Sequence, residues 1–271
     1  MSAIGRSFPA ALGAAALVVV LAACGGGGGG GGAAAPTPGG VELVSEGQLT
    51  TCTHLPYEPF QFQQGAEIVG FDVEMVDLVA ARLGVEQQII DTPFDNIQSG
   101  AVFDTGQCDL GAAAMTITEA RLQNIDFSDP YFEATQALLV QKASGITGPE
   151  QLTGRRVGVQ NSTTGQEYAQ QNIAGAEIVV FEDLGLLLTA VQTGDVDAGI
   201  ADNGPLLDFA KKNPGLQVTA EFDTDEQYGF GVRKGNTALI EAINQTITDA
   251  KADGTYDRIY EKWFGQAPSQ G

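Results

Sequence analysis

The stretch that decides the fold is AAAMTITEARLQNIDFSDPYF, residues 112–132. It begins with small apolar residues that suit a buried strand, and it changes abruptly at Thr116 to a segment that brings Arg121 five positions later. A strand end that turns into a helix can be plain topology. It can also bind an anion, because free N–H groups at a helix start favour negative charge.

The chain around this stretch alternates short apolar runs with amphipathic segments. In 71–84 the apolar residues recur four positions apart, so one face of a helix is apolar, and Gly84 ends it. Such alternation predicts α/β lobes with mainly parallel sheets flanked by helices. There are too many units for one small sheet, and 141–154 resembles a boundary loop, so we predict two lobes. The predicted strands are 48–53, 109–115, 156–160, 177–181, 196–201 and 228–234, and the predicted helices are 71–84, a segment capped by Thr118, 166–173, 184–193, 237–254 and 255–265.

Ligands of open parallel sheets bind beyond the carboxyl ends of the strands. This rule selects the residues after Thr53, Met115, Gln160 and Ala201. The cation among them, Arg121, has a planar fork that pairs with a carboxylate.

The selected residues also include a carboxylate, Asp202, that could balance an ammonium group. The N–H of Thr164 begins a helix, and the rings of Tyr57 and Phe94 could stack on a ligand. Each residue also has an ordinary structural alternative: a solvated helix arginine, a turn-forming aspartate, an N-cap or a core ring. Together they describe a site for a zwitterion.

The first 23 residues read as a secretory signal, with Arg6 before an apolar core at 10–23. That core is shorter than the about 20 apolar residues that a membrane span needs. LAAC, residues 21–24, looks like the lipobox of bacterial lipoproteins, which implies a lipid on Cys24; the alternative is an ordinary signal with an accidental cysteine. The rest of 24–40 is Gly-rich and predicts a flexible tether that reaches on the order of 20 Å.

Charge, histidine and cysteine content limit the classes of partner and of site that we expect. The formal net charge is −21, and removing the leader deletes one base, so the mature chain has 12 − 34 = −22. Nucleic acid and anionic lipid surfaces are therefore poor partners. The single histidine, His54, excludes a His-cluster metal site or a nucleophilic triad, and we expect no metal and no cofactor. In an oxidising compartment Cys52 and Cys108 could pair, and the sequence leaves this open.

Five motifs occur in an order that resembles bacterial polar amino-acid-binding proteins, the solute-binding family 3 receptors of ABC importers. This resemblance implies a two-lobed Venus flytrap fold of the periplasmic-binding-protein type, with two crossover hinge strands near 134–140 and 228–232. It implies lobe 1 at 41–135 and 229–267, lobe 2 at 136–228, and a tail at 268–271. The motifs are EIVGFDVEMVDLVAARLG (67–84), MTITEARLQNIDFSDPYF (115–132), VGVQNSTTG (157–165), GDVDAGIADN (194–203) and DGTYDRIYEKWFG (253–265).

The resemblance also implies roles for single residues. Arg121 would bind the α-carboxylate of an amino acid, helped by the N–H groups of Thr116 and Thr164. Asp202 would bind the α-ammonium, shared with the Thr116 hydroxyl and the Ala114 carbonyl. Tyr57 and Phe94 would form aromatic walls around the side chain.

Two positions depart from the common family pattern. The chain has His54 where many relatives have aspartate, and Gln160 where some glutamine binders have lysine. Losing that aspartate weakens the case for a basic ligand, so glutamine or glutamate is the preferred ligand, and arginine, lysine or histidine is the alternative.

We therefore expect a non-catalytic, monomeric receptor outside the cytoplasm. It would bind a free L-amino acid, deliver it to an ABC permease, and contact the membrane only through a lipid on Cys24. A dehydratase-like enzyme on the same scaffold, with Glu58 or His54 as acid or base, and a ligand-sensing domain are the alternatives of other classes.

Overall fold

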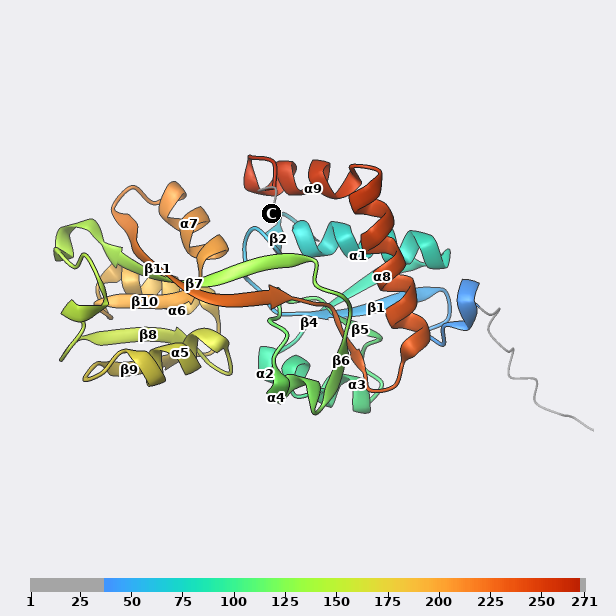
Figure 1. Ribbon diagram of the computed structural model, residues 1–271, viewed down its shortest axis with the longest axis horizontal. Coiled ribbons are helices and arrows are strands. Elements are labelled where there is room, and N and C mark those ends of the chain that lie inside the picture. The colour runs from blue at the N-terminus through green and yellow to red at the C-terminus, as the bar shows by residue number, and fades with distance from the viewer. Residues whose placement is uncertain (1–36, 269–271) are drawn as a thin grey trace, which may run out of the picture. The chain divides into compact units, whose positions relative to one another are not determined.

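A computed structural model describes residues 37–268 of the chain (Figure 1). The predicted leader, the predicted lipid attachment site Cys24 and most of the predicted tether lie outside the described residues. The last tether residues form a short 3-10 helix, η1 (Pro38–Gly40). Within 37–268, none of the helices has both the length and the apolar composition needed to span a membrane.

Two five-stranded sheets and a small hairpin organise the chain, as expected for a two-lobed α/β fold. The first sheet has the order β4 (Glu86–Asp91), β1 (Gln48–Thr53), β5 (Leu110–Gly111), β12 (Gly231–Arg233), β6 (Ile125–Phe127). The second has the order β11 (Leu216–Tyr228), β7 (Phe132–Gln141), β10 (Ala198–Asp202), β8 (Arg156–Gln160), β9 (Glu177–Phe181). The hairpin is β2 (Phe62–Gln64) with β3 (Glu67–Val69).

The predicted fold class is confirmed: each sheet is mainly parallel, although one strand of opposite direction in each, β12 or β7, makes both sheets mixed. Strand β1 is parallel to β4 and β5, whereas β12 is antiparallel to β5 and β6. In the second sheet β8 is parallel to β9 and β10, whereas β7 is antiparallel to β10 and β11. The antiparallel pairs arise because β7 leaves the first sheet and β11 returns beside it in the opposite direction (Figure 1).

The first sheet is covered on one face by α1 (Phe71–Leu83), α8 (Thr237–Ala252) and α9 (Thr255–Phe264), and on the other by α2 (Phe94–Gln98) and α3 (Ala101–Asp104) (Figure 1). The predicted four-residue repeat of α1 is buried along its length. Gly84 ends α1 in the left-handed conformation, as predicted. Gly70, before α1, lies so close to the Phe60 carbonyl that a Cβ would stand 2.0 Å from its oxygen.

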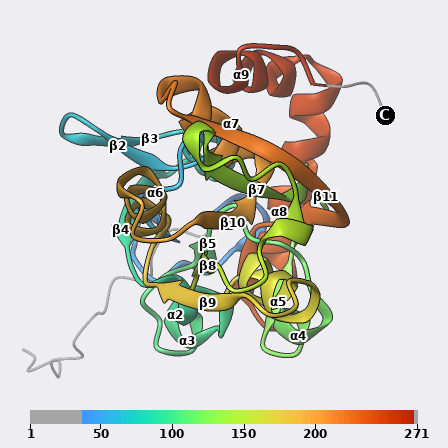
Figure 2. The same cartoon turned by 90° about the vertical axis from the view of Figure 1, so that its left-hand side faces the viewer.

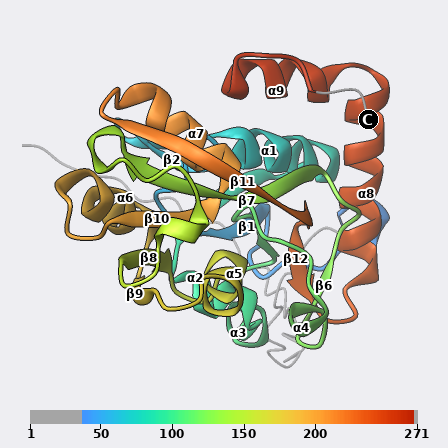
Figure 3. The same cartoon turned by 60° about the vertical axis from the view of Figure 1, so that its left-hand side comes forward.

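The second sheet also has helices on both faces. Leu138 and Val140 of β7 pack with Ala169 of α5 (Thr164–Asn172). The alternate residue Leu139 packs instead with Leu187 of α6 (Leu184–Thr193). Because successive strand residues point to opposite faces, α5 and α6 lie on opposite faces of the sheet (Figures 2 and 3). Helix α7 (Asn203–Lys212) joins the α6 side, and η2 (Lys142–Ser144) and η3 (Pro149–Gln151) lie in the predicted boundary loop.

Several predicted elements differ in length from the structure. The strand expected at 109–115 is only β5, which ends at Gly111, and a strand reaching Met115 is impossible because Ala114 has φ +47, a left-handed conformation. The strand expected at 228–234 is divided between β11 and β12. Thr118 caps α4 (Glu119–Leu122), as predicted.

Cys52 in β1 and Cys108 just before β5 form a disulfide, with Cα atoms 5.7 Å apart. Both cysteines are buried. The bond joins two adjacent segments of the first sheet, on the side covered by α2 and α3.

Candidate functional site

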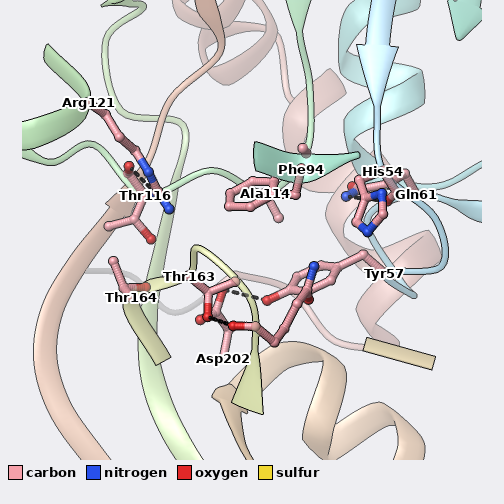
Figure 4. Close-up of a pocket in the computed structure, with 12 residues that line it drawn as sticks. His54, Tyr57, Gln61, Phe94, Ala114, Thr116, Arg121, Thr163, Thr164 and Asp202 are labelled. Carbon is pink, nitrogen blue, oxygen red and sulfur yellow. Dashed lines mark hydrogen bonds between the residues drawn. The ribbon is translucent and has the colours of Figure 1, made fainter. Parts of the chain in front are cut away.

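A buried pocket takes its walls from both sheets (Figure 4). It contains all nine residues that the sequence predicted as ligand-binding: His54, Tyr57, Phe94, Ala114, Thr116, Arg121, Gln160, Thr164 and Asp202. Three further residues, Gln61, Ala113 and Thr163, complete the lining. They follow strands or lie in the loop after β1, where the strand-end rule directed attention without selecting them.

Arg121 lies at one end of the pocket, in the first turn of α4. Its side chain is only 5 % exposed, so the alternative of a solvated helix arginine is wrong. Its Nη1 donates to the Thr116 carbonyl at 2.8 Å, and its Nη2 to the Ser162 carbonyl at 3.2 Å. The guanidinium also lies 5.1 Å from the centre of the Phe94 ring.

Burial lowers the pKa of Arg121, and nearby acids, Asp202 foremost, counteract the shift. Because the ordinary pKa of arginine is above 12, the group keeps its charge in this pocket. Phe94 thus lines the pocket and also packs against the charged guanidinium of Arg121.

Asp202, the last residue of β10, supplies a buried carboxylate to the same pocket. It accepts hydrogen bonds from the Tyr57 hydroxyl at 2.7 Å, from Gln136 Nε2 at 2.5 Å and from the Tyr228 hydroxyl. Burial and then the charge of Glu226 raise the pKa of Asp202 to about 6, against these three hydrogen bonds, which lower it. The pocket thus pairs a permanent cation with an acid that is ionised near neutral pH.

Ala114 forms part of the pocket wall in its left-handed conformation. Its N–H donates to Asp72 Oδ2 at 2.8 Å, and the Tyr131 hydroxyl donates to Asp72 Oδ1 at 2.7 Å. Asp72 is fully buried in α1, and burial raises its pKa to about 7. A carboxylate in the core of the first lobe therefore holds the backbone of the pocket wall.

His54 and Gln61 lie at the opposite end of the pocket from Arg121 (Figure 4). His54 Nδ1 lies 3.0 Å from the Thr92 carbonyl. A carbonyl only accepts, so Nδ1 carries a hydrogen, and in the neutral imidazole Nε2 is then an acceptor. Gln61 Nε2 donates to the His54 carbonyl at 3.5 Å, which directs the Gln61 oxygen elsewhere.

Three buried acceptors of the pocket have no hydrogen-bond partner among the described residues: His54 Nε2, Gln61 Oε1 and Gln160 Oε1. Unpaired buried polar atoms are rare and costly. A ligand that brings N–H donors to these atoms would satisfy them.

The two threonines of the pocket have a partner that the sequence interpretation missed. The hydroxyls of Thr116 and Thr164 both donate to Glu226 Oε2, at 2.6 and 2.7 Å. The cap of α5 is Thr163, which accepts from Gln166 N, so the Thr164 hydroxyl is not the N-cap. One signal in the sequence could have drawn attention to this region: Gln136 is a polar residue inside the apolar run ATQALLV. A polar residue at a position expected to be buried is informative, because such residues are mostly exposed.

Glu58, the sequence candidate for a catalytic acid or base, is outside this pocket. Its Oε1 lies 2.6 Å from Lys212 Nζ, and its side chain is 38 % exposed. His54 remains in the pocket, with Nδ1 committed to a carbonyl.

A family model described as bacterial extracellular solute-binding proteins, family 3, matches residues 49–266. The chain belongs to this family. Its members act outside the cytoplasm, and the polar amino-acid-binding proteins of ABC transporters are among the relatives of this chain. The resemblance stated from the motifs is confirmed.

Individual relatives agree with the family assignment. The chain is 37 % identical over 209 residues to an ABC transporter glutamine-binding protein of Bacillus subtilis (strain 168), covering 75 % of this chain and 76 % of the relative. A solved structure of an ancestral arginine-binding protein bound to arginine is 39 % identical, with a TM-score of 0.76, covering 81 % of this chain and 99 % of that one. The ancestral arginine-binding protein bound to glutamine is 38 % identical, with a TM-score of 0.76, covering 82 % of this chain and all of that one.

Proposed function

We propose that the protein is an extracytoplasmic receptor that binds an L-amino acid and delivers it to the permease of an ABC importer. The observation that carries this proposal is the pairing of Arg121 and Asp202 in one buried pocket. A fixed guanidinium suits the α-carboxylate, and an ionised carboxylate suits the α-ammonium. Tyr57 and Phe94 supply apolar walls between the two ends of the pocket.

The ligand's side chain would carry N–H donors. Three acceptors of the pocket have no partner among the described residues, and a second carboxylate near them would face lone pairs instead of hydrogens. This argument favours glutamine over glutamate, and it supports arginine, whose guanidinium has five donors, equally well. The relatives named above include proteins described for both of these amino acids.

Binding would require the two lobes to move apart and close again. The cavity volume is about 20 Å³, room for little more than a water molecule. The contacts across the site, such as Tyr57 with Asp202 and Arg121 with the Ser162 carbonyl, join segments of different sheets. Ligand contacts made by both lobes would stabilise the closed state.

Localisation and partners belong to the same proposal. The leader would export the chain, a lipid on Cys24 would anchor it, and the tether would let the folded part reach the permease. Mass spectrometry of the purified protein from its native membrane tests this directly. A mature N-terminus other than a lipid-bearing Cys24 would contradict the anchor.

A thermal-shift screen of the purified protein against the common L-amino acids tests the function. A ligand present at 100 times its dissociation constant adds about 2.7 kcal/mol to the free energy of unfolding. We expect glutamine or arginine to give the largest shift. Analysis of the bound compound after long incubation separates a receptor from an enzyme, because a receptor returns its ligand unchanged.

A further inference from the structure

A second buried carboxylate, Glu226, lies behind the pocket, and the proposed function does not use it. Its side chain is 7 % exposed. It accepts hydrogen bonds from four side chains: Thr116 and Thr164 on Oε2, and Gln136 and Thr224 on Oε1. Four accepted hydrogen bonds match the capacity of an ionised carboxylate.

An irregularity of strand β11 aims this carboxylate. Phe222 of β11 pairs with Gln136 of β7, and the next β11 residue with a partner is Glu226, which pairs with Ala134. Between these two pairs β11 therefore uses four residues where β7 uses two. The extra residues include Asp225 with φ +52, a conformation that costs energy for a residue other than glycine. Bulges of this kind redirect side chains beside binding sites.

The partners of Glu226 come from both lobes. Thr116 follows the β5 strand of the first sheet, and Thr164 begins α5 on the second. Glu226 itself lies on β11, one of the two strands that run between the sheets. One carboxylate oxygen therefore joins the two lobes across the site.

The same contacts fix the direction of two hydroxyl hydrogens. An ionised carboxylate only accepts, so the hydrogens of Thr116 and Thr164 point at Glu226. Both threonines line the pocket, and what their hydroxyl oxygens offer a ligand is lone pairs, of which Thr164 keeps one because Gln136 Nε2 donates to its oxygen at 3.3 Å. Lone pairs bind an ammonium group and do not bind a carboxylate.

We propose that Glu226 is a positioning residue for amino-acid binding, which turns the hydroxyls of Thr116 and Thr164 into acceptors for the ligand's ammonium and bridges the lobes. This inference rests on the proposed function. It assigns the ammonium a set of acceptors from both lobes, beside Asp202, and leaves the ligand's carboxylate to Arg121 and main-chain N–H groups.

The test compares Glu226→Gln with Glu221→Gln, a matched control on the same strand whose side chain is exposed and bonds Asn203. Calorimetry uses L-glutamine and L-arginine, and their analogues that lack the α-amino group, glutaramate and 5-guanidinopentanoate. We expect Glu226→Gln to weaken amino-acid binding about tenfold or more, with a much smaller effect on the analogues, and Glu221→Gln to change neither. Affinity within twofold of the wild type, or an equal loss for amino acid and analogue, would overturn the assignment.

A ligand-free measurement separates this inference from the proposed function. Small-angle scattering without ligand should give a larger radius of gyration for Glu226→Gln than for the wild type and for Glu221→Gln. If the wild type binds no amino acid, the proposed function fails. The bridge between the lobes is tested separately, because an unchanged radius of gyration in Glu226→Gln would overturn it. Thr164→Val, which removes one bridging hydroxyl and keeps the carboxylate, should reproduce the preferential loss if Glu226→Gln folds poorly.

Discussion

The two ends of the pocket differ in how their polar groups are satisfied. At one end, Arg121 and Asp202 already have protein partners that hold them in place. At the other end, acceptors of His54 and Gln61 have none among the described residues, and the same holds for Gln160 Oε1 in the pocket lining. Under the proposed function, the part of an amino acid that never varies would meet a rigid, preformed site, and the part that varies would meet groups that only the right side chain can satisfy.

The largest loss should come from the rigid end. Arg121→Ala removes the cation that faces the ligand's carboxylate, and truncating one partner of a buried charge pair costs about 2–5 kcal/mol, about 30-fold or more in affinity. Arg82→Ala, which removes a surface pair with Asp249, is the control. Calorimetry with the ligand from the thermal-shift screen measures the affinity of both variants. Undiminished affinity of Arg121→Ala would show that this end of the pocket does not bind the ligand's carboxylate.

The pH should act through Asp202, whose pKa of about 6 lies above its ordinary value of 3.8. The ammonium needs the ionised form, so affinity should rise as the pH increases through 6 and level off above it. Asp202→Asn should weaken binding and abolish this pH dependence. Binding measured from pH 5 to pH 8 tests it, and an unaltered profile in the variant would assign the dependence to another group.

In the ligand-free protein the raised pKa of Asp202 makes the free energy of unfolding decrease as the pH rises, opposite to the expected rise in ligand affinity. A pKa raised on folding means that the protonated acid is favoured in the folded state, so this stabilisation is complete below pH 3.8 and lost as the pH rises through about 6. Thermal unfolding of Asp202→Asn across this range should show less decline than the wild type.

Changes at the selective end should alter preference more than total affinity. Gln61→Leu removes an unpaired acceptor, and about 0.5–1.5 kcal/mol of a new hydrogen bond to glutamine or arginine is lost with it, roughly two- to tenfold. Binding of an apolar side chain of similar length, such as norleucine, should improve instead. Gln63→Leu on the exposed hairpin serves as the control, and equal losses for both kinds of ligand would show that this end does not select.

The smallest effect should come from the rim of the pocket. Ser162 Oγ donates to Asp95 Oδ1 at 2.9 Å in an exposed position that joins segments from the two sheets. Exposed polar contacts contribute little, so Ser162→Ala should change affinity by no more than about threefold. A larger loss by calorimetry would mean that the contact between the lobes at the rim helps to hold them closed.

The sequence predicted the residues of the pocket better than the lengths and the pairing of the strands. The nine residues came from the ends of strands and from motif order, and strand ends gather at one place for topological reasons that hold whatever the local details. The strand predicted at 109–115 cannot reach Met115 because Ala114 is left-handed, and no pattern of hydrophobicity indicates that conformation. The mixed sheets depended on the return path of β11, which local alternation does not encode.

Glu226 was missed for a related reason. In the sequence it lies in the acidic run EFDTDEQ, 221–227, which reads as a solvated segment. Only the bulge before it turns this one carboxylate inward while Glu221 stays exposed. Gln61 was missed because it lies in a loop, where the side-chain direction depends on backbone geometry and not on period.

Asp72 limits how this protein can change during evolution. Substitutions at His54, Gln61 or Gln160 can explore new ligands one at a time, since the acceptor that each brings to the pocket has no partner among the described residues. Asp72, by contrast, holds both the Ala114 wall and Tyr131 at the start of β7 from inside the core of α1. A lineage that loses it would have to rebuild the pocket wall and the approach to the hinge together, so new specificities should arise by changes at the far end while the first turn of α1 stays constant.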